Sequence, residues 1–173
     1  MEHGIREATK KLHDELEALP FNQKMFRGEL TREERLSWLA AQLNVFELLD
    51  PHVREDLRRS DLIRQDIEAL GGKNVWAPAA YWFDLKNNVK GRLDGHIYLN
   101  YMGLLYGGQI MSERYPESSR LYQFDDVKGA RKYIRETFVQ PHETEEWFVF
   151  QVRNGFQMHI RQTQTLQREH NVE

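Results

Sequence analysis

The fold of this chain is decided by the stretch HIYLNYMGLLYGGQI, residues 96–110. Three glycines, Gly103, Gly107 and Gly108, interrupt an otherwise apolar helical pattern, and each costs about 0.8–1 kcal/mol relative to alanine. Gly103 and Gly107 are four residues apart and share one helix face, where a neighbouring backbone or a flat ligand can approach closely. The pattern leaves two interpretations open: close packing of two helices, or a kinked helix lying over a planar cofactor.

Apolar residues recur with helical spacing on both sides of this stretch. Ile5 begins an N-terminal stripe that Pro20 ends, and Thr31 with Glu34 forms a capping box that opens a second helix. Further helices are expected over residues 94–114, 127–138 and, starting at Pro141, 141–166. No segment alternates cleanly as a half-buried strand would. The sequence therefore predicts an all-α, single-domain multi-helix bundle over residues 1–173.

Composition excludes several classes of protein. The chain has 173 residues, with 24 basic against 27 acidic side chains and a net charge of −3, which argues against a general nucleic-acid binder. It has no cysteine, which excludes thiolate catalysis, iron–sulfur ligation and disulfides. No apolar run approaches the roughly 20 residues of a membrane span, and Met1-Glu2-His3-Gly4 lacks a signal-peptide core. We expect a cytoplasmic protein.

Two histidines stand beside apolar helical stripes. His13 borders the stripe of the first helix, and His159 continues a stripe on the last helix after Phe156. A histidine in such a position is more commonly a core residue with its hydrogen bonds satisfied, but an axial ligand to haem iron also requires a neutral imidazole on an apolar wall. The residues alone leave these alternatives open.

Three segments taken together resemble the haem oxygenase family. Residues 5–13, IREATKKLH, resemble the family's proximal helix, whose histidine ligates the iron. Residues 101–109, YMGLLYGGQ, resemble its distal helix, which kinks over the haem at two glycines. Residues 58–67, RRSDLIRQDI, resemble its middle segment, and the likeness continues in order through Phe156. It implies a helical bundle that holds haem between the proximal helix and the glycine-rich distal helix.

The resemblance also assigns roles to residues. His13 would be the metal ligand, Gly103 and Gly107 would be distal backbone contacts, and Arg6 and Tyr98 would lie near a propionate. Other expected haem contacts are Thr9, Leu104, Lys132, Arg135 and Phe156.

The chain departs from the family pattern in the distal pocket. The family's distal aspartate, which anchors the water network for proton delivery, is replaced by Leu104. The usual tyrosine and arginine partners appear as Phe46 and Asn100, and an asparagine on the last helix falls at His159. We expect a rebuilt relay in which ordered water is held by the Gly103 carbonyl, Asn100 and His159. A ligand role for His159 is the alternative.

The resemblance implies an enzyme that uses O2 to open haem b to a bilin (biliverdin), CO and ferrous iron. Its electrons would come from a partner protein, a reductase or ferredoxin. A second hypothesis is a haem carrier or sensor that keeps the pocket without turnover, favoured by Leu104 and Phe46. A third is a helical module without haem, akin to the thiaminase-type family, although that family's nucleophilic cysteine is missing here.

Overall fold

The computed structural model describes residues 2–173, with side chains from residue 4 onward. Within that range the regular structure is helical and includes no strand, as the sequence predicts. Met1, part of the N-terminal stretch considered for a signal peptide, lies outside the described residues. The longer helices are α1 (Glu2–Ala18), α2 (Pro20–Phe26), α3 (Arg32–Leu49), α4 (Ser60–Ala69), α5 (Ala80–Asn87), α6 (Asp94–Arg114), α7 (Val127–Ile134) and α8 (Glu146–His170). Short helical turns are η1 (Asp50–His52), η2 (Glu55–Leu57), η3 (Pro116–Ser118), η4 (Arg120–Tyr122) and η5 (Arg135–Val139).

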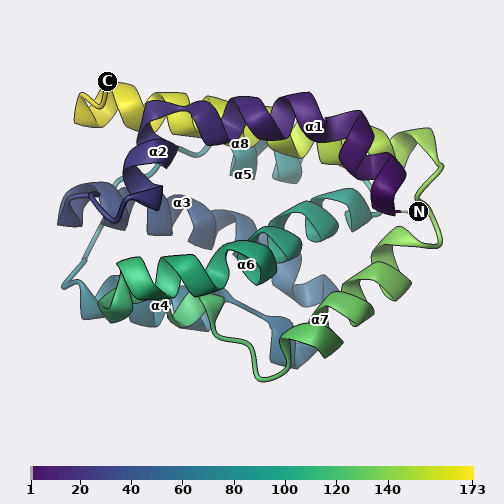
Figure 1. Ribbon diagram of the computed structural model, residues 1–173, viewed down its shortest axis with the longest axis horizontal. Helices are drawn as coiled ribbons and strands as arrows, with labels where there is room; N and C mark the ends of the chain where they lie inside the picture. The colour runs from purple at the N-terminus through teal and green to yellow at the C-terminus, as the bar shows by residue number, and fades with distance from the viewer. Residues whose placement is uncertain (1) are drawn as a thin grey trace.

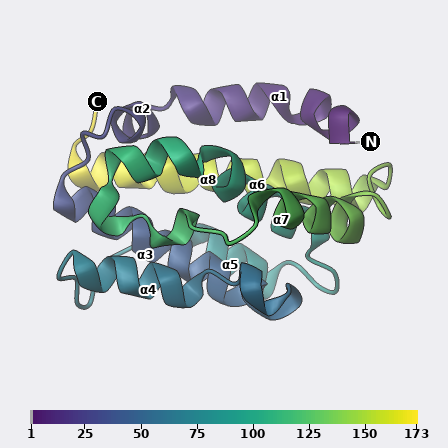
Figure 2. The ribbon, with the colours of Figure 1, turned by 60° about the horizontal axis from the view of Figure 1, so that its bottom comes forward.

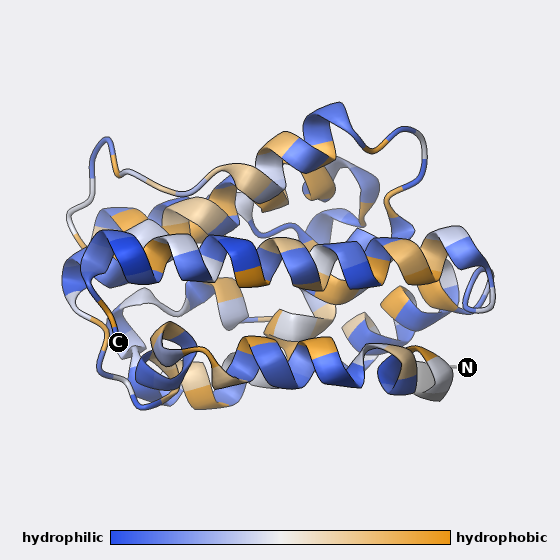
Figure 3. Cartoon of the chain, turned by 90° about the horizontal axis from the view of Figure 1, so that it is seen from above, coloured by the Kyte–Doolittle hydropathy of each residue, from blue (hydrophilic) through white to orange (hydrophobic). Residues whose placement is uncertain are grey.

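The helices are arranged in layers. Helix α1 runs beside α8 (Figure 1), and these two pack against each other although they lie at opposite ends of the chain. Figure 2 shows α1 and α2 above a middle layer of α6, α7 and α8, with α3, α4 and α5 beneath. Seen from above (Figure 3), α1 and α8 turn mainly hydrophilic residues outward. Hydrophobic side chains therefore face the spaces between the layers, where the core cluster lies.

Helix ends follow the expected local chemistry in several places. The Thr31 side chain accepts a hydrogen bond from the Glu34 amide, and the Glu34 carboxylate accepts one from the Thr31 amide, so the predicted capping box is confirmed. Gly71 follows α4 with a φ of +71°, the left-handed conformation that favours glycine. Pro20 ends α1 as expected but also opens α2, because proline fits the first helical turn.

The start of the last helix was predicted wrongly. We expected it at Pro141, yet residues 140–144 form turns and α8 begins at Glu146. His142 instead packs its ring against Trp147, with ring centroids 5.0 Å apart, and lies 3.6 Å from Asp94 at the start of α6. These tertiary contacts outweigh the helix-initiating preference of proline.

Helices α6 and α8 cross closely because glycines stand at the crossing points. A Cβ on Gly95 would lie 2.6 Å from Gln151, and one on Gly155 would lie 2.4 Å from Leu99. The Gln151 side chain also accepts a hydrogen bond from the Gly95 amide and donates one to the Arg92 carbonyl, which caps the start of α6. This crossing fixes α6 relative to the last helix.

Within residues 2–173, none of the helices combines the length and the apolar character needed to cross a membrane.

Candidate functional site

A cavity of about 940 Å³ lies between α1, α2, α6 and α8, with α3 closing one side. Its volume is at the upper end of the range of roughly 300–1,000 Å³ that is typical of small-molecule sites. Most of the residues expected at a haem site line it: Arg6, Thr9, His13, Tyr98, Asn100, Gly103, Leu104, Gly107, Phe156 and His159. The folding of the chain thus gathers side chains from both ends of the sequence around one space.

The three glycines of α6 have different surroundings. A Cβ built on Gly103 or Gly107 would meet no atom within 4 Å, and both residues line the cavity. A Cβ on Gly108 would lie 2.9 Å from the Cβ of Tyr122. Gly108 therefore permits close packing against Tyr122, while Gly103 and Gly107 leave a smooth stretch of wall that a flat ligand could approach.

His13 faces the cavity from α1, and its side chain is 52% exposed. Its ring meets the Phe156 ring edge to face, with centroids 6.0 Å apart. Glu17 Oε1 lies 3.3 Å from Nε2, and Asp14 Oδ1 lies 3.6 Å from Nδ1. Carboxylates commonly accept a hydrogen bond from a histidine ring and so fix its orientation, and Glu17 and Asp14 are each placed to do this for His13.

One end of the cavity is cationic. Arg6 from α1 and Arg135 from η5 both donate to the Tyr106 hydroxyl, over 2.9 and 2.5 Å. The Arg131 guanidinium lies 4.2 Å from the centroid of the Tyr106 ring and donates to the Leu105 carbonyl. Guanidinium groups are well suited to binding carboxylates.

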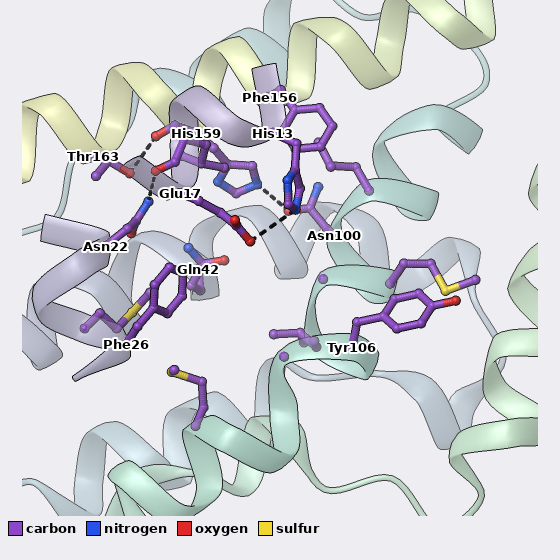
Figure 4. A pocket seen from close by; sticks show the side chains of 18 of the residues that line it. His13, Glu17, Asn22, Phe26, Gln42, Asn100, Tyr106, Phe156, His159 and Thr163 are labelled. Carbon is purple, nitrogen blue, oxygen red and sulfur yellow. Dashed lines mark hydrogen bonds and ion pairs between the residues drawn. The ribbon is translucent and has the colours of Figure 1, made fainter. Parts of the chain in front are cut away.

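The opposite end of the cavity combines apolar and amide side chains and has no cation cluster like that at Tyr106 among the residues that line it. Phe26 and Tyr106 lie at opposite ends of the pocket in Figure 4. Asn22 and Gln42 lie beside Phe26 there, and the cavity lining also includes the apolar side chains of Met25, Trp38, Ile110, Met111 and Leu166. The cavity is thus matched to a flat ligand that carries anionic groups along one edge.

A buried hydrogen-bond network borders the cavity at Asn100 (Figure 4). Asn100 Nδ2 lies 2.8 Å from the His96 carbonyl oxygen and 2.9 Å from the Tyr81 hydroxyl. Because a carbonyl oxygen only accepts, it fixes the orientation of the amide and turns Oδ1 toward His159 Nε2, which is 2.8 Å away. Both amide protons of Asn100 are therefore used within the protein.

This orientation determines the tautomer of His159. Since Asn100 Oδ1 accepts, His159 Nε2 carries the proton, and Nδ1 is left with the lone pair. The Tyr81 hydroxyl accepts from Asn100 and so gives its own proton to His96 Nδ1, 2.7 Å away. Burial lowers the pKa of both His96 and His159 to about 4, so both are neutral near pH 7.

The expected substitutions in the distal pocket occupy different places. Leu104 lines the cavity and is buried, so an apolar side chain stands where the family pattern has a carboxylate. Phe46 is fully buried, with its ring centroid 5.1 Å from that of Tyr101. It packs in the core and is not part of the cavity lining.

Lys132 and Arg135, the two basic residues expected to bind haem from the α7 region, lie in different surroundings. Arg135 does not line the cavity itself but donates a hydrogen bond to Tyr106, which does. Lys132 does not line the cavity either: its ammonium lies 3.9 Å from Glu136 and its side chain is exposed. The structure therefore supplies no contact in support of Lys132 as a haem-binding residue.

Several residues of the site were missed in the sequence. Tyr106 is three residues after Gly103 and so shares the glycine face, a spacing that could have identified it. Tyr81 had no local signal, because it reaches Asn100 and His96 from α5 only through the tertiary fold. Gly155 makes room for this contact, since a Cβ there would lie 2.9 Å from the Tyr81 hydroxyl.

Comparison with known proteins agrees with this geometry. The family model described as "Heme oxygenase" matches residues 1–162. The chain belongs to the haem oxygenase family. Heme oxygenase 1 of Gallus gallus is 21% identical over 203 residues, covering 95% of this chain and 69% of that protein. Heme oxygenase 1 of Bos taurus is 23% identical over 77% of this chain and 57% of that protein, so the chain spans little more than half of that relative.

Solved haem oxygenases share the fold. A heme oxygenase-1 from the cyanobacterium Synechocystis, crystallised in complex with heme, superposes with a TM-score of 0.80 at 20% identity. That match covers 96% of this chain and 92% of the other. The heme oxygenase of Leptospira interrogans gives a TM-score of 0.79 at 17% identity, covering 93% and 97%. The predicted all-α haem oxygenase-like fold is confirmed.

Proposed function

We propose that this haem oxygenase binds haem b in the cavity and opens it to biliverdin, CO and ferrous iron, using O2 and electrons from a reductase or ferredoxin. The observation that carries the proposal is the pairing of His13 on one wall with Gly103 and Gly107 on the other. An imidazole that faces two glycine positions across a cavity leaves room for an iron porphyrin between them.

The residues around the cavity fit haem. The two glycine positions leave space that a Cβ would occupy, the cavity volume suits a porphyrin, and the cationic end suits its two carboxylates. His13 would ligate the iron, with Glu17 or Asp14 orienting its ring. Arg6 and Arg135 would bind the propionates. Tyr98 and Thr9 would complete the wall near them.

Bound haem supplies the iron for oxygen activation, and its ring is also the substrate. The protein must then orient the ring, limit water and hold proton donors in place. Leu104 offers no hydrogen bond, and Asn100 has used both amide protons, so neither donates to a water in the cavity. His159 Nδ1 remains as an acceptor and is the atom that would hold such a water.

His159 would position water without itself acting as the proton source. With its pKa lowered to about 4 by burial, about one molecule in a thousand carries the extra proton at pH 7. Protons would therefore pass through water held between His159 Nδ1 and the Gly103 backbone. The expected relay is thus refined: Asn100 acts by orienting His159.

The experiment is turnover of the hemin-loaded chain under air with ascorbate, or with ferredoxin and its reductase. We expect the Soret absorbance to fall as bilin absorbance rises, with CO and ferrous iron recovered in proportion. A Soret band that persists without bilin would contradict the oxygenase proposal and would indicate the carrier or sensor. Replacement of His159 by Ala tests the relay: we expect slower bilin formation with unchanged hemin affinity.

A further inference from the structure

The Tyr106 hydroxyl lies where two walls of the cavity meet. It accepts hydrogen bonds from Arg6 of α1 over 2.9 Å and from Arg135 of η5 over 2.5 Å. The Arg131 and Arg6 guanidiniums also lie 4.2 and 5.2 Å from the centroid of its ring. One phenol thus gathers three guanidinium groups from two segments of the chain, one from α1 and two from the α7–η5 stretch.

A carboxylate would suit this position better than a phenol. Two guanidiniums that converge on one oxygen form the donor geometry of a carboxylate site, and hydrogen bonds to an ionised acceptor are roughly twice as strong as those to a neutral one. The phenol oxygen has two lone pairs, and these two donors use both. The Tyr106 hydroxyl therefore holds two donors that an ionised carboxylate would bind more strongly.

The phenol can leave without any movement of the helix. Its side chain is 45% exposed, so rotation requires little repacking. Gly107 follows it directly and Gly103 stands one turn earlier, and neither position carries a side chain that would block the ring. Arg131 stays anchored to the Leu105 carbonyl, which keeps one cation at this end of the cavity.

We propose that Tyr106 is a displaceable internal ligand of the propionate site. In the ligand-free protein its hydroxyl joins Arg6 to Arg135 across the end of the cavity. A carboxylate on the incoming ligand displaces the hydroxyl and takes both guanidiniums. The competition selects for flat ligands with free carboxylates on one edge, because a ligand without them cannot replace the bonds that it breaks. The inference rests on the proposed function for the identity of the ligand.

The test compares Tyr106→Phe with wild type, using hemin and hemin dimethyl ester as probes. The variant keeps the ring and removes the competing oxygen. We expect its affinity for hemin to rise by roughly tenfold, the effect of one charge-assisted hydrogen bond. Its affinity for the ester, which has no free carboxylate, should change by less than about twofold, a factor worth only about 0.4 kcal/mol. Optical titration and stopped-flow association rates measure both.

Tyr133→Phe is the matched control. The Tyr133 hydroxyl also accepts from an arginine, the Arg54 amide, and the Arg54 guanidinium lies 4.6 Å from its ring centroid, yet Tyr133 does not line the cavity. This variant should bind both probes as wild type does. A loss of hemin affinity in Tyr106→Phe, or an equal change for both probes, would overturn the proposal while leaving the proposed function intact. A wild type that binds no hemin would instead overturn the proposed function and this inference with it.

Discussion

At the residue scale, His159 shows how a neighbour can set the chemistry of a side chain. Its tautomer is fixed by Asn100, whose amide is fixed in turn by the His96 carbonyl. The sequence placed His159 and Asn100 at the distal wall through their positions in the family pattern. It could not reveal that Tyr81 completes the network, because that contact depends on how α5 packs against α6 and α8.

His96, one of the two histidines of this network, predicts a pH dependence of stability. Burial lowers the pKa of His96 to about 4, whereas an unfolded histidine titrates near 6.5. Between these values the unfolded state binds more protons. The free energy of unfolding therefore falls as pH decreases from about 6.5 toward 4, by up to about 1.4 kcal/mol per pH unit for one histidine. Urea unfolding measured across this range checks the slope.

His96→Gln should reduce the slope of the unfolding free energy against pH by up to about 1.4 kcal/mol per pH unit, the contribution of one proton. His52→Gln removes an exposed histidine and should leave the slope unchanged. Equal slopes for wild type and His96→Gln would show that His96 is not held neutral by burial.

Glu17 offers a second prediction at this scale. Its carboxylate lies 3.3 Å from His13 Nε2, the arrangement of a group that orients a metal ligand. Glu17→Ala should weaken hemin binding by roughly tenfold, the lower end of the range for such partners. Glu15→Ala changes an exposed acid on the same helix that does not line the cavity, and hemin affinity should stay at the wild-type value. Optical titration compares the two, and an equal effect of both would argue for general charge instead of orientation.

At the element scale, α6 carries two kinds of glycine. Its boundaries were predicted from the sequence, since the apolar run and the flanking breaks are local signals. The sequence could not assign packing to Gly108 and the cavity wall to Gly103, because that division depends on where Tyr122 of η4 lies. The start of α8 was wrong for a similar reason, since His142 makes contacts across the fold.

This division predicts opposite effects of two alanine substitutions. Gly103→Ala should keep or raise the free energy of unfolding, by up to about 1 kcal/mol through helix propensity. It should also weaken hemin binding by roughly tenfold, because the new methyl group narrows the slot. Gly108→Ala should lower the free energy of unfolding by about 1–3 kcal/mol through overpacking against Tyr122. Denaturant melts and hemin titrations measure both quantities, and equal destabilisation by the two variants would contradict the assignment.

At the scale of the whole molecule, the cavity exists because the two ends of the chain come together. Helices α1 and α8 pack side by side (Figure 1), and both supply residues that line the cavity. Helical periodicity was enough to predict the all-α fold, and the resemblance named many of the residues that line the cavity. The cationic end was only partly predicted: Arg6 and Arg135 were named, while Tyr106, which joins them, was not.

The central claim is that His13 ligates haem iron across the cavity from the glycine wall. Optical titration of hemin into wild type, His13→Ala and the exposed control His52→Ala tests it most directly. We predict a sharp, shifted Soret band for wild type and the control, its loss in His13→Ala, and its return when free imidazole is added to that variant. The same Soret band in His13→Ala as in wild type, without imidazole, would contradict the account.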